Sequence, residues 1–124
     1  MIDFDTVSFV KLAPWDPKEA LVELADLLLP DEQVLLAFKG TRDSVTFTSR
    51  RVVALNVQGI TGKKRDYSSL PYGKVNVFSI ETAGTLDRDS ELELWFSEVG
   101  KVKFNFASGV DVRAIGRLIA ERVL

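Results

Sequence analysis

Residues 45–82 read VTFTSRRVVALNVQGITGKKRDYSSLPYGKVNVFSIET, and this stretch carries the clearest structural pattern of the chain. Apolar residues with a high strand preference alternate there with polar ones, as in strands that bury one face. A glycine-bearing turn at residues 59–62 interrupts the alternation, since glycine takes the positive φ angles that tight turns need. Three basic residues follow at 63–65. The stretch therefore predicts consecutive hairpins with a basic cluster at one turn.

Sequence on both sides continues this alternation. Seven strands are expected in all, at residues 34–39, 45–48, 52–57, 64–70, 74–82, 90–97 and 101–107. In the sixth strand Leu92, Leu94 and Phe96 share one face. This face meets the apolar face of the seventh strand only if paired residues differ in number by an even amount. A loop at residues 98–100 satisfies this condition and places Leu92 opposite Phe106.

A helix is expected from Pro17 to about Leu29, whereas residues 1–16 show no clear periodicity. Asp16 is in position to cap the helix, and proline is well suited to the first helical position. Three leucines form an apolar stripe at helical spacing, Leu21, Leu24 and Leu28. Such a stripe faces either the core or a neighbouring subunit.

A second helix is expected from about Gly109 to residue 124, with Ser108 as its N-cap. Its apolar residues also recur at helical spacing, at Val112, Ile115, Leu118, Ile119 and Val123. A helix, seven antiparallel strands and a helix predict a mainly β fold with α, a bent sandwich or partly open barrel capped by the C-terminal helix. We divide the chain into a helical extension, residues 1–29, and a domain, residues 30–124.

The composition excludes several kinds of active site. The 124 residues include no cysteine and no histidine. Ser-His-Asp, Cys-His and histidine-zinc sites are therefore excluded. The acidic residues fall mostly on expected turns and outward positions, where no carboxylate pair forms a cleft. We predict no catalytic residues, no metal, no cofactor and no enzymatic activity.

Two short motifs resemble known sites but lack their required features. The glycines of GITGKK, residues 59–64, have two residues between them, whereas the glycines of a P-loop have four between them and the loop continues into a helix. A GXXG loop that binds nucleic acid belongs among helices that are not expected here. Residues 87–91, DRDSE, lack the glycine of a calcium loop and include an arginine. Both motifs are interpreted as turns.

No segment reaches the about 18 apolar residues that span a bilayer. The acidic start, MIDFDTVSF, lacks the basic region of a signal peptide. We expect a cytoplasmic protein.

The charged residues are unevenly distributed along the chain. Net charge is −6 over residues 1–38, +6 over residues 39–74 and −2 over residues 75–124. Either the acidic segment packs against the basic one, within or between subunits, or the basic residues bind an anionic ligand such as a phosphate or lipid headgroup. The candidate anion-binding residues are Lys39, Arg42, Arg50, Arg51, Lys63, Lys64 and Arg65. Nucleic acid is not expected, because the chain is acidic overall and few aromatic residues accompany the cluster.

Trp95 stands out on the polar face of the sixth strand, where the predicted register places it opposite Lys103. A tryptophan in such a position is covered either by a loop or by a binding partner. Together with the leucine stripe of the first helix, it gives four candidate interface residues, Leu21, Leu24, Leu28 and Trp95.

The chain resembles the bacterial pleckstrin-homology family over about residues 30–124. The resemblance lies in TSRR at 48–51, GITGKK at 59–64, LPY at 70–72, the segment 78–84 and DSEL at 89–92. It implies a pleckstrin-homology-like barrel, assembly into homo-oligomeric rings and no established enzymatic activity.

One departure concerns ligand binding. Inositide-binding pleckstrin-homology domains have a basic first hairpin around a sizeable loop, whereas Lys39 and Arg42 here flank only a short turn, residues 40–42. We therefore do not expect inositide binding. The sequence predicts a non-enzymatic binding or scaffolding domain that forms a homo-oligomer or binds a protein partner. The alternative is an anion or lipid-headgroup binder.

Overall fold

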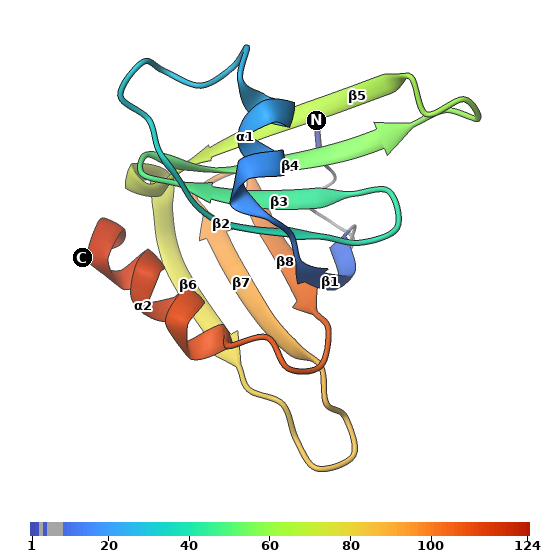
Figure 1. The fold of residues 1–124 in the computed structure, drawn as a ribbon. Helices are drawn as coiled ribbons and strands as arrows, with labels where there is room; N and C mark the ends of the chain where they lie inside the picture. Colours follow the sequence, from blue (N-terminus) through green and yellow to red (C-terminus); the bar gives the residue numbers. More distant parts are fainter. Residues whose placement is uncertain (3, 5–8) are drawn as a thin grey trace.

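The computed structural model describes residues 1–2, 4 and 9–124, which form a bent sheet with two helices (Figure 1). Within these residues lie eight strands, β1 (Phe9–Pro14), β2 (Val34–Lys39), β3 (Ser44–Thr48), β4 (Arg51–Gln58), β5 (Lys64–Pro71), β6 (Val75–Glu81), β7 (Ser90–Phe96) and β8 (Gly100–Phe106). The same residues include α1 (Pro17–Leu24), α2 (Val112–Val123) and a short 3₁₀ helix, η1 (Tyr72–Lys74). The seven predicted strands correspond to β2–β8, each within one residue at either end.

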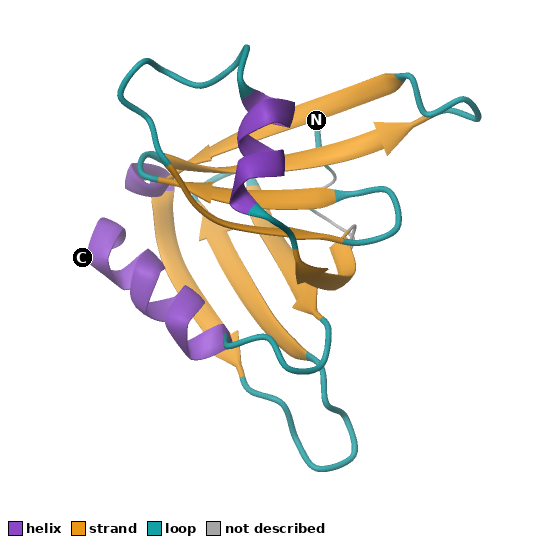
Figure 2. Ribbon diagram, in the orientation of Figure 1, coloured by secondary structure: helices purple, strands orange, loops and turns teal. Residues whose placement is uncertain are grey.

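The strands form one sheet in the order β5-β4-β3-β2-β1-β8-β7-β6. Neighbours run antiparallel except β1 and β8, which run parallel. The sheet bends so that β2–β5 lie across β6–β8, and β1 joins the two halves (Figures 1 and 2). β5 and β6 are its edges, so the barrel is not closed. The predicted fold class is confirmed, whereas the all-antiparallel count of seven is corrected to a mixed sheet of eight.

β1 is the strand that the sequence did not predict. Phe9 and Leu12 are fully buried, whereas Val10 and Lys11 between them are exposed. Lys11 has a φ of 54°, and the register against β8 shifts at this point. A bulge of this kind breaks the two-residue alternation by which strands are predicted. Residues 1–29 thus contribute a central strand as well as a helix, and their separation as a domain stays a prediction.

The β7–β8 hairpin has the predicted pairing of apolar faces in a corrected register. Leu92 lies opposite Phe104, not Phe106, and Leu94 lies opposite Val102. The shift is two residues, so the same side chains still face the core. The requirement that apolar faces match does not distinguish registers that differ by two residues.

The turn between β7 and β8 accounts for the corrected register. Gly100 has a φ of 131° and pairs with Phe96, so the loop begins one residue earlier than predicted. This backbone angle suits glycine and no residue with a Cβ. As a result Trp95 lies opposite Lys101 rather than Lys103.

The core lies between the two crossing halves of the sheet. Its largest fully buried side chains include Phe9 of β1, Phe47 of β3, and Phe104 and Phe106 of β8. The ring of Phe38 lies 5.0 Å from that of Phe106 and 6.1 Å from that of Phe47, edge to face in both cases. These aromatic contacts connect the two halves of the sheet.

α1 covers the outer face of β2–β4, so these strands are buried on both sides (Figure 1). Ala37, Thr46 and Val53 are cross-strand neighbours on this face and are nearly inaccessible. The helix ends at Leu24 rather than at Leu29, and residues 25–27 form turns. The shorter helix buries Ala20 and Leu24.

α2 packs beside β6 and β7. Its N-cap is Asp111, whose side chain accepts a hydrogen bond from the backbone N–H of Ala114 at 3.1 Å, so the prediction of Ser108 was wrong. The predicted apolar stripe is confirmed, with Val112, Ile115 and Ile119 buried and Leu118 and Val123 packed against the core. Gly116 faces Ile80 so closely that a Cβ would lie 3.1 Å from its Cγ2 atom.

The close approach of α2 to β6 gives a stability prediction. Gly116→Val should lower the free energy of unfolding by about 1–3 kcal/mol, because the added methyl groups overpack the contact with Ile80. In an Ile80→Ala background the same change should cost much less. Ala114→Val, at an exposed position of α2, is the matched control. Urea unfolding measures all four variants, and an equal cost at residues 114 and 116 would contradict the packing argument.

Candidate functional site

The structure divides the seven basic candidates between two ends of the hairpins. Consecutive hairpin turns lie at opposite ends of an antiparallel sheet. Arg50 and Arg51 occupy the β3–β4 turn and the start of β4. The other five lie toward the opposite end, around the β2–β3 and β4–β5 turns, at Lys39, Arg42, Lys63, Lys64 and Arg65. The seven residues therefore do not form one continuous patch.

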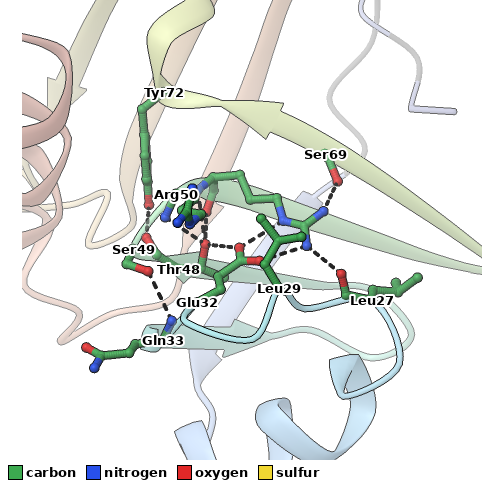
Figure 3. A network of polar contacts seen from close by, with 10 residues as sticks. Leu27, Leu29, Glu32, Gln33, Thr48, Ser49, Arg50, Ser69 and Tyr72 are labelled. Carbon is green, nitrogen blue, oxygen red and sulfur yellow. Dashed lines mark hydrogen bonds and ion pairs between the residues drawn. The ribbon is translucent and has the colours of Figure 1, made fainter.

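At the first end, Arg51 is held by a buried carboxylate. The guanidinium donates to both carboxylate oxygens of Glu32, from Nε and Nη2, at 2.9 Å each. It also donates to the backbone oxygen of Leu27 at 2.7 Å and to Ser69 Oγ at 2.9 Å (Figure 3). The side chain of Glu32 is fully buried and that of Arg51 is 20% exposed. All of these contacts fix Arg51 in place, so it has little capacity left for an external anion.

Glu32 receives further hydrogen bonds from its surroundings. Thr48 Oγ1 donates to one carboxylate oxygen at 2.5 Å, and the backbone N–H of Leu29 donates to the other at 3.1 Å. Burial on its own raises the pKa of Glu32, but the hydrogen bonds from Arg51, Thr48 and Leu29 outweigh it and lower the pKa to about 2. The carboxylate is therefore ionised throughout the physiological range and has no proton to exchange.

Two neighbouring contacts extend this network. Arg50 forms an exposed ion pair with Asp31. The hydroxyl of Tyr72 donates to the backbone oxygen of Thr48 at 2.7 Å, and burial raises the pKa of this phenol. Together they connect the segment before β2 to the β3–β4 turn and to η1. Figure 3 shows the contact of Tyr72 with Thr48.

At the second end, α1 supplies the opposite charge. Glu23 accepts a hydrogen bond from Arg65 at 2.8 Å and another from the hydroxyl of Tyr67 at 2.8 Å. Burial first, and Glu23 second, raise the pKa of Tyr67. The acidic segment of the sequence thus packs against the basic one within the chain, through Glu23, Asp31 and Glu32.

The remaining four cations have other surroundings. Lys39 lies 5.4 Å from the ring centroid of Trp15, and Arg42 donates to the backbone oxygen of Gly59 at 2.6 Å. Lys63 and Lys64 are exposed beside the β4–β5 turn. Within residues 1–2, 4 and 9–124, none of the four forms an ion pair. They are the part of the predicted patch that remains accessible to a ligand.

The four predicted interface residues have different environments. Trp95 is 41% exposed, and Lys101 Nζ lies 4.9 Å from its ring centroid. Leu21 is also exposed, whereas Leu28 is half-buried. Leu24 is buried against the sheet and is inaccessible to another subunit. The predicted leucine stripe therefore does not form one face, and Leu28 lies beyond the end of α1.

Sequence reasoning missed a cleft at the open side of the barrel. It has a volume of about 490 Å³ and lies between the end of β5, the start of β6 and the β7–β8 turn. Phe4, Leu70, Pro71, Phe96 and Val99 give it an apolar lining. Its residues come from separate segments, so no local motif marks it.

The described part of the chain contains no cluster of three carboxylates that would hold a metal ion. None of its helices has the length and apolar character needed to cross a bilayer.

The ionised Glu32–Arg51 pair gives a pH-dependent prediction. The pKa of Glu32 is about 2 in the folded protein and about 4.3 in an unfolded chain, a difference worth about 3 kcal/mol. A lowered pKa stabilises the fold above the unfolded value, and this stabilisation is lost as the pH falls toward 2. Glu32→Gln should therefore lower the free energy of unfolding by about 3 kcal/mol at pH 7 and by much less near pH 2.

Asp31→Asn is the control, because this exposed pair should contribute less than about 1 kcal/mol. Denaturant unfolding followed by tryptophan fluorescence measures both variants across the pH range. A pH-independent difference between Glu32→Gln and the unsubstituted protein would contradict the assignment.

Comparison with known proteins identifies relatives across nearly the whole chain. The sequence pattern of the Bacterial PH domain family matches residues 4–123. The uncharacterised protein YjqA of Bacillus subtilis (strain 168) is 43% identical over 100 residues, which cover 79% of this chain and 80% of YjqA.

Solved structures extend the comparison. A DUF1696-family protein with a pleckstrin-homology domain from Shewanella loihica PV-4 is 37% identical, with a TM-score of 0.82, over 93% of this chain and 99% of that one. A pleckstrin-homology domain from Shewanella amazonensis SB2B is 40% identical, with a TM-score of 0.70, over 89% and 90%. A protein from Exiguobacterium sibiricum 255-15 that contains such a domain shares the fold, with a TM-score of 0.72 at 20% identity, over 91% of this chain and 62% of that one.

Proposed function

This chain belongs to the bacterial PH domain family, and we propose that it is a non-enzymatic scaffolding domain that assembles into a ring-like homo-oligomer. The absence of histidine and cysteine from the sequence supports the non-enzymatic part. The deeply buried carboxylate of Glu32 also favours it, because Arg51 and Thr48 hold that group ionised in a structural network.

The observation that carries the assembly proposal is an exposed apolar pair at the edge of the sheet. Val77 of β6 lies opposite Trp95 of β7, and the two are 58% and 41% exposed. They point away from the core, since Phe78 and Leu94 alternate with them on the inner face. α1 lies on the other half of the sheet, and Gly116 of α2 faces the inner side of β6.

An accessible tryptophan beside an aliphatic residue on an edge strand is typical of a protein interface. Tryptophan is among the residues that most often dominate binding energy. An uncovered sheet edge also invites pairing with another chain. The charged neighbours of the pair on β7 and β8 are balanced, since two lysines accompany two glutamates. Lys103 lies 3.4 Å from both Glu91 and Glu93, and Lys101 lies over the Trp95 ring. A second copy of the same chain therefore meets an apolar strip without an excess of like charge.

Substitution on this strip tests the proposal. In sedimentation velocity at micromolar concentration, the unsubstituted protein should have a multiple of the 13.8 kDa protomer mass. Val77→Lys should shift the protein toward monomer, because it places a charge in the buried interface. Val10→Lys is the matched control, since Val10 is 56% exposed on a strand of the same sheet. A monomeric unsubstituted protein would overturn the proposal.

A second candidate function is binding to an anionic lipid surface. Ile60 at the tip of the β4–β5 turn is wholly exposed, and Lys63 and Lys64 follow it closely. An apolar residue that enters the headgroup region beside lysines is the arrangement of a peripheral membrane contact. Each lysine near an anionic surface contributes about 1 kcal/mol.

Vesicle binding tests this candidate. The protein should co-sediment with phosphatidylserine-containing vesicles at low salt and less at moderate salt. The double change Lys63→Glu and Lys64→Glu should weaken this binding by roughly tenfold or more. The control is Arg113→Glu with Arg117→Glu, which reverses an exposed basic pair on α2. No binding of the unsubstituted protein at low salt would end this candidate.

A further inference from the structure

The loop between β6 and β7 presents an isolated apolar side chain to solvent. Leu86 is 97% exposed within a stretch that is otherwise polar or small, residues 82–89. Figure 1 shows this loop extending away from the body of the molecule. A fully exposed leucine side chain contributes no hydrophobic stabilisation to the folded monomer.

Hydrogen bonds give this loop a defined shape. The backbone N–H of Gly84 donates to the backbone oxygen of Asp87 at 2.7 Å and closes a turn that holds Leu86 near its apex. Asp89 accepts a hydrogen bond from the amine of Lys11 at 2.8 Å, which connects the loop to β1. A protruding side chain on a preorganised loop loses less conformational entropy when it binds.

The cleft on the open side of the barrel has the opposite shape. Its apolar lining includes the rings of Phe4 and Phe96, which lie 6.2 Å apart, edge to face. Among the described residues that line it, Lys74 is the one with a charged side chain, and none of these described residues carries a carboxylate. The volume of about 490 Å³ is in the range of cavities that take a small ligand or a buried side chain.

The loop and the cleft lie at opposite ends of the same pair of strands. The cleft adjoins the end at which Val75 pairs with Phe96, and the loop follows the end at which Glu81 pairs with Glu91. Seven residues of β6 separate them by about 20 Å. A protrusion and a hollow at opposite ends of one molecule fit each other only between copies, head to tail.

We propose that Leu86 of one copy docks in this cleft of the next copy, and that this contact propagates the assembly. The proposal rests on the homo-oligomer of the proposed function and names the surfaces that meet. Head-to-tail contacts of this kind close into a ring when the rotation between copies permits. The cleft also adjoins the apolar pair described above, since Asn76 precedes Val77 and Phe96 follows Trp95.

Charge favours a second copy as the occupant. Asp87 directly follows Leu86 in the loop, and Lys74 lies in the wall of the cleft. Docking the leucine therefore brings a carboxylate to an amine, a complementary pair that also fixes orientation. An apolar peptide without an acidic neighbour gains only the apolar part of this contact.

The first experiment removes the docked side chain. Leu86→Ser should weaken self-association by about 10- to 100-fold in sedimentation equilibrium, the effect of a leucine that is no longer buried. Ile60→Ser is the matched control, because Ile60 is equally exposed at another loop tip and should leave the mass unchanged. Lys74→Glu and Asp87→Lys should each weaken association, and the two together should restore it.

The second experiment exploits the absence of cysteine from the chain. A variant with Leu86→Cys and Val99→Cys should form a ladder of cross-linked species under mild oxidation, because each copy bonds to two neighbours. Val99 is suited to this role, since it lines the cleft and is 55% exposed. Either cysteine alone should give dimers at most.

The outcomes separate this inference from the function on which it rests. A monomeric unsubstituted protein would overturn both. An oligomer whose mass is unchanged by Leu86→Ser, and whose double-cysteine variant gives no ladder, would overturn the docking contact and leave the scaffold intact. Dissociation by Leu86→Ser together with the ladder would establish the contact.

Discussion

The buried carboxylate of Glu32 connects the segment before β2 to the side chains of two neighbouring strands. It precedes β2, yet it receives hydrogen bonds from Arg51 in β4 and Thr48 in β3. Arg51 in turn reaches Ser69 of β5 and the backbone of Leu27. A guanidinium buried here without its carboxylate would carry an uncompensated charge. The acidic character of the first 38 residues is therefore part of the fold.

This constraint changes the meaning of the charge pattern. A run of positive charge beside a run of negative charge suggests a binding site. Among the residues that the structure describes, however, three of the seven basic candidates form ion pairs with acidic side chains of the same chain. Those partners come from α1 and from the segment before β2, so the N-terminal region completes the surface of the sheet. The cations that remain accessible are concentrated near the β2–β3 and β4–β5 turns.

Much of the fold was predictable, because the alternation that marks β2–β8 is a direct consequence of burying one face of a strand. β1 was not, since the bulge at Lys11 destroys that alternation. The register of β7 and β8 was predicted only up to a two-residue shift, because such a shift leaves every side chain on the same face of the sheet. For the candidate site, adjacency in sequence placed Arg50 and Arg51 with Lys63 and Lys64, whereas hairpin geometry places them apart. No sequence motif marks the cleft. Leu86 could have been noticed in the sequence, because it is the one large apolar residue in the stretch 82–89.

The parallel pairing of β1 with β8 affects when this protein folds as well as how. Phe9 lies opposite Phe104, near the other end of the sequence. Closing so long a loop has an entropic cost that precedes any gain from the contact, and such pairings slow folding. During synthesis, β1–β5 emerge first and β2–β5 form hairpins with their neighbours, but the centre of the sheet stays incomplete until β8 has left the ribosome. Until then the edge of β1 that β8 later covers is open to other chains.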